Sequence, residues 1–225
     1  MNGPVSVIVF DVNETLSDMS PLETRFTDVG APGSLARLWF ASLLRDGFAV
    51  AATGGSVKFS VVAAEMLEGL LRELALNRAL DDAVTHVLGG LGVLNLHADV
   101  EGGVRALKQA GHRLATLSNG SDDLAEGLLT RASIRSDFEA VLSVEDAPAW
   151  KPVRSAYEYA ADALGVRPEN MLLVAVHSWD IHGAAEAGLR TAWLNRSDAR
   201  YPSYFAAPDH TIRALSDLVA HLPGR

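Results

Sequence analysis

A carboxylate directly follows the most strand-like segment of this chain. Val7–Phe10 is an apolar run, and Asp11 comes next, ahead of a polar turn that contains Asn13 and Thr15. Ligands of open parallel sheets bind beyond the carboxyl ends of the strands, so Asp11 occupies a position where a nucleophile or a base is expected. The alternative is an Asp that only caps the following turn, and this segment alone leaves that alternative open.

Three further polar clusters fall where strands are expected to end or helices to begin. They are Ser118 with Asn119, Lys151 with Tyr157, and His177 with Trp179 and Asp180. The donor-rich turn at 118–121 suits the binding of an anion. Each cluster also has a purely structural alternative: an N-cap, an exposed lysine, or an acidic residue in a first helical turn. Because the carboxyl ends of parallel strands meet at one edge of a sheet, we expect all three clusters to converge on Asp11.

The hydrophobic pattern after about residue 98 predicts alternating helices and strands. The first expected helix begins near residue 100 and ends at Gly111. Further helices are expected at 122–131, 153–164, 179–187 and 213–222. The expected strands are 114–117, 141–142, 171–176 and 192–194. Repeated units of this kind imply a parallel sheet flanked by helices, with right-handed crossovers.

The stretch between Leu16 and about residue 98 is different, because it carries only helical patterns. Apolar residues recur at helical spacing over 35–44 and 57–74, and Gly54-Gly55-Ser56 marks a break and a helix start. We therefore predict an α/β protein. Its Rossmann-like core comprises residues 1–16 and 98–225, and an all-helical cap is inserted at residues 17–97.

The composition limits the partners that we expect. The 225 residues are 48% hydrophobic, enough for a substantial core, and 19 Lys+Arg against 28 Asp+Glu give a net charge of −9. No nucleic-acid partner is expected, because phosphate neutralisation needs clustered cations. The absence of cysteine excludes disulfides and thiolate chemistry and fits a reducing compartment. Residues 1–4 lack signal-peptide features and no segment has membrane-spanning length, so we expect a cytoplasmic protein with no membrane partner.

Taken in order, Asp11, Ser118-Asn119, Lys151 and Asp180 resemble the four motifs of the haloacid dehalogenase (HAD) superfamily over essentially the full chain. Within it the chain is most similar to the L-2-haloacid dehalogenases, or type II dehalogenases. The strings that carry this similarity are Phe10-Asp11 with Thr15-Leu16, Leu117-Ser118-Asn119-Gly120-Ser121, Leu142-Ser143-Val144, Lys151-Pro152 with Tyr157, Trp179-Asp180 with Gly183-Ala184, and Trp193-Leu194-Asn195-Arg196. The resemblance implies a HAD-like core, a helical cap after the first strand, and a homodimer formed through the cap.

Two departures from the superfamily bear on the chemistry. Its phosphatases carry a second Asp where this chain has Asn13, and an amide cannot protonate a leaving group. Where their commonest fourth motif has Gly-Asp, this chain has Ala175-Val176, which weakens any Mg²⁺ site. We therefore expect no cofactor; Mg²⁺ would be needed only if the protein were a phosphatase.

The resemblance implies metal-independent hydrolysis of short 2-haloalkanoic acids, with the L (S) enantiomer preferred. Asp11 would form an ester with the substrate, and its hydrolysis would give a 2-hydroxy acid and halide. Lys151 would keep Asp11 anionic, and Asp180 would orient or deprotonate the water. The substrate-binding residues would be Ser118, Asn119, Asn13, Trp39, Phe40, Tyr157, His177 and Trp179. For the two cap aromatics, packing inside the cap is the alternative.

One departure affects the dehalogenase interpretation itself. In that family an Arg follows the cap Trp, whereas here Trp39 is followed by Phe40, and a phenyl ring offers an anion no donor. Helical geometry points Arg37 and Arg45 elsewhere. His177 stands where the better-known dehalogenases have Asn, and if protonated it would replace some positive charge; a neutral, hydrogen-bonded His177 is the alternative. Another HAD-type hydrolase, such as a weak Mg²⁺-dependent phosphatase, and a non-catalytic binder of small carboxylates remain as alternative functions.

Overall fold

The computed structural model describes residues 5–222. Residues 1–4, on which the expectation about a signal peptide rests, and residues 223–225 lie outside the described part. The strands are β1 Val7–Phe10, β2 Ser17–Asp18, β3 Asn95–Leu96, β4 Arg113–Ser118, β5 Ala140–Ser143, β6 Met171–Ala175, β7 Arg190–Leu194 and β8 His210–Ile212. The α-helices are α1 Leu22–Asp28, α2 Leu35–Ala52, α3 Phe59–Leu71, α4 Leu80–Gly89, α5 Val100–Gln109, α6 Asp122–Arg131, α7 Arg154–Leu164, α8 Ser178–Glu186 and α9 Leu215–His221. No helix in the described part is long and apolar enough to cross a membrane.

The core is a parallel sheet with β1 near its centre. The strand order is β5-β4-β1-β6-β7-β8, and every neighbouring pair in it is parallel. Side chains alternate across the sheet, as the two-residue period of a strand requires. Ile8 and Phe10 belong to the cluster on the α5 and α9 side, whereas Val7 and Val9 pack on the α7 and α8 side. The predicted α/β class and Rossmann-like core are confirmed.

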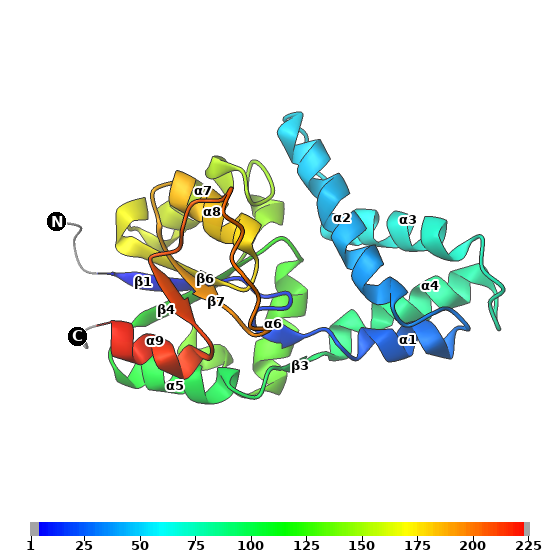
Figure 1. Ribbon diagram of the computed structural model, residues 1–225, viewed down its shortest axis with the longest axis horizontal. Coiled ribbons are helices and arrows are strands. Elements are labelled where there is room, and N and C mark those ends of the chain that lie inside the picture. Colours follow the sequence, from blue (N-terminus) through cyan, green and yellow to red (C-terminus); the bar gives the residue numbers. More distant parts are fainter. Residues whose placement is uncertain (1–4, 223–225) are drawn as a thin grey trace.

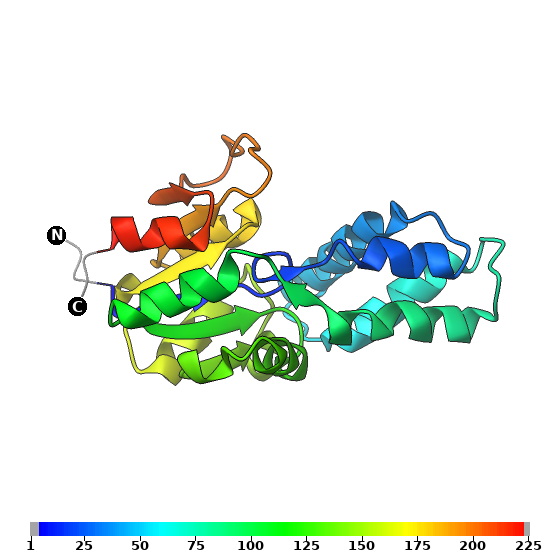
Figure 2. The ribbon, with the colours of Figure 1, turned by 90° about the horizontal axis from the view of Figure 1, so that it is seen from below.

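Helices cover both faces of the sheet, and α1 to α4 form a separate helical layer beyond its carboxyl edge (Figure 1). Figure 2 shows α5 and α9 side by side on one face, and they pack against each other. The four helices, hereafter the cap helices, are reached through the antiparallel pair of β2 and β3. The chain therefore leaves the core directly after β1 and returns to it directly before α5.

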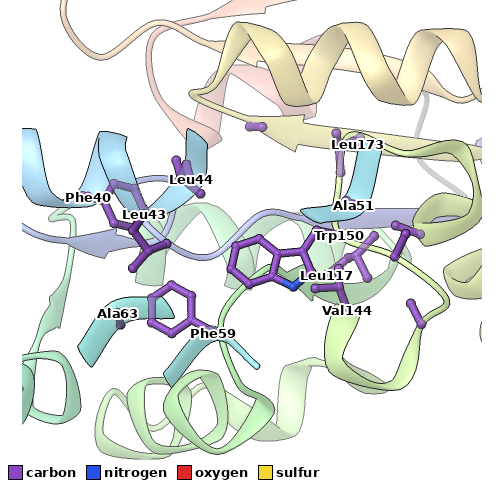
Figure 3. Packing of buried hydrophobic residues seen from close by; sticks show 14 of the residues in the cluster. Phe40, Leu43, Leu44, Ala51, Phe59, Ala63, Leu117, Val144, Trp150 and Leu173 are labelled. Atoms are coloured by element: carbon purple, nitrogen blue, oxygen red, sulfur yellow. The ribbon is translucent and has the colours of Figure 1, made fainter. Parts of the chain in front are cut away.

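Apolar side chains join the cap helices to the core (Figure 3). Trp150 projects from the core, stacks on Phe59 of α3 with ring centroids 6.2 Å apart, and donates its indole N–H to the Val57 carbonyl oxygen at 2.8 Å. Gly47 of α2 lies directly over this ring, since a Cβ built there would be only 2.4 Å from Trp150 Cζ3. Trp150 is therefore in contact with both α2 and α3, and it is one of the side chains that join the cap helices to the core.

The structure differs from the expected elements at short or tertiary-dependent segments. The stretch predicted to be purely helical also contains β2 and β3, which are too short to produce a periodic pattern. The edge strand β8 was missed, and α9 begins at Leu215 instead of 213. The helix start assigned to Gly54-Gly55-Ser56 is wrong, because α3 begins at Phe59, whose backbone N–H donates to the Glu145 carboxylate of the core at 3.0 Å.

We expect Gly47→Ala to destabilise the protein by about 1–3 kcal/mol, because the added methyl group overlaps the buried indole of Trp150. Gly102→Ala is the matched control, since Gly102 is an exposed position of α5 with nothing within 4 Å of its Cβ site. That change should be neutral or stabilise by up to about 1 kcal/mol, because alanine favours helix. Denaturant unfolding measures both; equal stability of the two variants would contradict this packing.

Candidate active site

The site forms beyond the carboxyl ends of β1, β4 and β6, where the polar clusters meet. Asp11 follows β1, Ser118 ends β4, and His177 and Asp180 lie at the start of α8, which follows β6. Lys151 reaches the same place from the segment before α7. Each of these strands ends at the same edge because the sheet is parallel, so the predicted convergence is observed.

A buried ammonium group links two carboxylates at the centre of the site. Lys151 is fully buried, and its Nζ donates to Asp11 Oδ1 at 2.9 Å and to Asp180 Oδ2 at 2.6 Å. Tyr157, also fully buried, donates its hydroxyl proton to Asp180 Oδ1 at 2.6 Å. Burial of charge is costly unless opposite charges and hydrogen bonds compensate. The three charged groups, Lys151, Asp11 and Asp180, each have such partners.

The second oxygen of Asp11 accepts two different hydrogen bonds. The Thr15 hydroxyl donates to Oδ2 at 2.7 Å and itself accepts the Val176 backbone N–H at 3.1 Å. His177 Nδ1 lies 3.0 Å from the same Oδ2, and its Nε2 lies 2.8 Å from Glu14 Oε2. Both imidazole nitrogens therefore face a carboxylate oxygen.

The electrostatics follow from burial and from these partners. Burial alone would raise the pKa of Asp11, but Lys151, His177 and Thr15 outweigh it and hold that pKa well below the usual range. Burial disfavours the Lys151 ammonium, yet the two carboxylates raise its pKa above the ordinary value. The pKa of Asp180 is raised, mainly by burial and further by Asp11, against the opposing effect of Lys151. Asp11 is thus the anion at neutral pH, and Asp180 is the more basic of the two carboxylates.

His177 carries a positive charge at neutral pH. Burial would lower its pKa, but the hydrogen bonds to Asp11 and Glu14 raise it to about 9. Trp179 stacks on the imidazole with ring centroids 5.0 Å apart, and Phe40 approaches it from the cap at 6.5 Å. The geometry therefore favours a protonated His177 over the neutral, hydrogen-bonded form that the sequence left as the alternative.

The two cap aromatics take different places. Phe40 faces the site through His177, whereas Trp39 is fully buried among the cap helices and donates its indole N–H to the Ala63 carbonyl oxygen at 3.0 Å. Trp39 therefore packs inside the cap and does not reach Asp11, in agreement with the alternative that the sequence left open for this residue. Arg37 and Arg45 pair with exposed acidic residues and do not replace the missing cap Arg.

The loop after β4 holds the remaining predicted residues. Asn119 donates to the Lys151 carbonyl oxygen at 3.1 Å and accepts the Lys151 backbone N–H at 3.0 Å, so it fixes the lysine backbone. Ser118 Oγ accepts the Gly120 N–H at 2.9 Å, which leaves its own proton to donate elsewhere. Asn13 lies next to Gly120 and Ser118, and all three line a small hollow of about 10 Å³.

Mg²⁺ does not fit the residues at this site. An ion between Asp11 and Asp180 needs further oxygen ligands, but the Lys151 ammonium already contacts both carboxylates. Ala175 and Val176 offer no side-chain oxygen. Within residues 5–222, no group of three or more His, Asp or Glu side chains is arranged to hold a metal ion. The arrangement does not suit the phosphatase alternative.

The sequence did not indicate Glu14 as part of the site, and it indicated Thr15 only as part of a string that resembles the type II dehalogenases. Thr15 lies four residues after Asp11, and that spacing was the available signal for a contact. Glu14 gave no such signal, because its partner His177 is 163 residues away in the chain. Only the parallel neighbours β1 and β6 bring the two turns together.

The Rossmann-like core, the inserted cap helices and the buried carboxylate beyond the central strand are the features expected of the haloacid dehalogenase superfamily. Comparisons with known proteins support this class. A family model for haloacid dehalogenase-like hydrolases matches residues 5–188. The haloacetate dehalogenase H-2 of Moraxella sp. (strain B) is 30% identical over 222 residues, which cover 97% of each chain. An (S)-2-haloacid dehalogenase of Pseudomonas putida is 31% identical over 215 residues, covering 94% of this chain and 93% of the relative.

A solved structure agrees with these relatives. The L-2-haloacid dehalogenase from Xanthobacter autotrophicus with chloropropionic acid covalently bound matches with a TM-score of 0.85 and 25% identity, over 96% of this chain and 97% of that one. This chain belongs to the haloacid dehalogenase-like hydrolases. The resemblance to that superfamily and to its type II dehalogenases is confirmed.

The raised pKa of His177 predicts a specific pH dependence of folding stability. The charged imidazole stabilises the folded state fully below the unfolded pKa of 6.5, and this contribution is lost as the pH rises through the folded value of about 9. Relative to His177→Asn, the wild type should therefore lose about 2–3 kcal/mol of unfolding free energy across this window. Denaturant unfolding at pH values on either side measures it; a difference between the proteins that does not change with pH would show that His177 is neutral.

Proposed function

We propose that this protein is a hydrolytic dehalogenase of short 2-haloalkanoic acids that prefers the (S) enantiomer and requires no metal. The observation that carries the proposal is the buried Asp11 carboxylate, kept anionic by Lys151, which also binds Asp180. The relatives' activities support the substrate class. A halide ion leaves carbon as a stable anion, so this site needs no acid at the position of Asn13.

The reaction has two steps. An Asp11 oxygen attacks C2 of the substrate from behind the carbon–halogen bond, which forms an ester and expels halide. Water then attacks the Asp11 carbonyl carbon and releases the 2-hydroxy acid. Asp180 is our candidate for orienting and deprotonating this water, since its raised pKa makes it the stronger base. Tyr157 and Lys151 hold Asp180 in place.

The substrate carboxylate would bind at the loop after β4. Ser118 has a hydroxyl proton to donate there, and Asn119 has a second amide proton beyond the one given to Lys151. A groove of about 280 Å³ next to this loop is lined mainly by apolar side chains of α3, α4 and α6, including Ala63, Leu88 and Leu124. We propose that residues 17–97 act as a cap unit that excludes competing water and selects the substituent on C2.

We expect wild-type protein to release halide from (S)-2-chloropropionate with a chelator present, and to release it more slowly from the (R) enantiomer. Asp11→Asn should release none, because an amide cannot act as the nucleophile. Intact-mass analysis of wild type stopped during turnover should find the substrate attached to Asp11. Absence of halide release from both enantiomers and from chloroacetate, together with absence of the ester, would refute the proposal.

We further propose that the protein is cytoplasmic and forms a homodimer through the cap helices. An exposed groove of about 650 Å³ runs along α2 and α3. Its apolar lining residues are Val50, Val57, Val61, Val62, Met66 and Leu70. Large exposed apolar surfaces commonly mark interfaces between proteins. Two acidic residues, Asp46 and Glu65, also line this groove beside the apolar residues.

Analytical ultracentrifugation tests the dimer. Val61 is 43% exposed on α3, so Val61→Glu should give a monomer by placing an unpaired charge in the interface. Val93→Glu is the control, because Val93 is 56% exposed and outside the lining of this groove. A monomeric wild type at all accessible concentrations, or equal behaviour of both variants, would contradict the proposed interface.

A further inference from the structure

A chain of hydrogen bonds runs from Glu14 through His177 to Asp11. Neither ester formation nor ester hydrolysis, as described above, assigns it a role. His177 Nε2 lies 2.8 Å from Glu14 Oε2, and its Nδ1 lies 3.0 Å from Asp11 Oδ2. Carboxylate oxygens only accept hydrogen bonds, so both ring nitrogens must carry protons to satisfy both contacts. Glu14 thus keeps His177 in the form that donates to the nucleophile.

The backbone at Glu14 is held in an uncommon conformation. Its φ of 60° lies in the left-handed region, which a residue with a side chain rarely adopts. The Glu14 carbonyl oxygen accepts a hydrogen bond from His97 Nε2 at 3.0 Å, which secures the turn. Such strain persists where the surrounding structure imposes it, commonly at functional sites. This turn directs the Glu14 carboxylate toward His177.

The two oxygens of Asp11 are not equivalent. Oδ2 accepts protons from Thr15 and His177, whereas Oδ1 accepts one from Lys151. A carboxylate oxygen has two in-plane lone pairs, so those of Oδ2 are both engaged and Oδ1 retains one for attack. Attack through Oδ1 makes it the ester oxygen, and Oδ2 becomes the ester carbonyl oxygen.

This assignment determines where charge develops during ester hydrolysis. Water adds to Cγ of Asp11, its proton passes to Asp180, and the carbonyl electron pair moves onto Oδ2. The carbonyl then re-forms, the Cγ–Oδ1 bond breaks, and the departing alkoxide takes the proton from Asp180 and leaves as the 2-hydroxy acid. Asp11, now holding the water oxygen, loses its remaining proton to solvent. The transient negative charge on Oδ2 faces Thr15 and His177.

We propose that Glu14 is a positioning residue that keeps His177 doubly protonated, so that His177 and Thr15 together act as oxyanion donors for hydrolysis of the Asp11 ester. This inference rests on the proposed function and deepens it. Fixed donors aimed at developing charge lower the barrier of the step in which that charge appears. The charged groups that face His177 are Asp11 and Glu14; α2 presents the uncharged ring of Phe40, and α8 presents Trp179. Lys151 binds the other oxygen of Asp11.

The test compares Glu14→Gln with Glu101→Gln, which makes the same change at an exposed residue of α5 that pairs with Arg105. In rapid-quench experiments with (S)-2-chloropropionate, Glu14→Gln should release a first equivalent of halide at the wild-type rate and then turn over on the order of 10-fold or more slowly. The Asp11 ester should accumulate, and the loss of turnover at high pH should begin at lower pH. Glu101→Gln should match the wild type in all three respects.

Two results would overturn the inference. One is ester hydrolysis by Glu14→Gln with the wild-type rate and pH profile; the other is slowing of the first halide release in place of ester hydrolysis. NMR titration of the His177 imidazole, assigned by comparison with His177→Asn, is independent of turnover and should show the proton lost at lower pH in Glu14→Gln. If the wild type forms no ester, the proposed function fails, and this titration still decides the Glu14–His177 pairing: an unchanged titration rejects it.

Discussion

The buried ammonium of Lys151 is the interaction on which the rest of the site depends. It separates two carboxylates, Asp11 and Asp180, that would otherwise repel each other away from water, and it lets both remain close to one point. Asn119 holds the lysine backbone from two sides, and Tyr157 fixes the far oxygen of Asp180. Loss of the cation would leave uncompensated buried charge, which is far more costly than the loss of a surface ion pair.

The cap helices pack against the core beside this site. Their apolar faces pack on Trp150 and its neighbours (Figure 3). The same arrangement brings the ring of Phe40 within 6.5 Å of the His177 ring. The buried side chains of the cap helices and of one face of the sheet form a single hydrophobic cluster, in which Trp39 is a structural residue. Under the proposed function the cap excludes water, and the low local dielectric constant then strengthens the electrostatic contacts below it.

Two departures of this chain from the dehalogenase pattern, Phe40 and His177, belong together. A guanidinium at position 40 would stand next to a protonated His177, and two adjacent cations repel each other; Phe40 avoids that repulsion. Glu14 in turn supplies the carboxylate that a charged His177 needs. Positive charge at this edge of the site thus comes from the turn after β6 rather than from the cap, and it contacts the nucleophile directly.

The parallel α/β core, the helical insertion and the convergence of Asp11, Lys151 and Asp180 were predictable from the sequence, because periodicity and turn chemistry are local and the four motifs lie where strands end or helices begin. The order of the strands within the sheet was not predicted. The tertiary structure alone decided the two-residue strands, the start of α3, the inward burial of Trp39 and the pairing of Glu14 with His177. These features depend on contacts between segments far apart in the chain, and a pattern along the sequence carries no record of which distant groups will satisfy a given donor or charge.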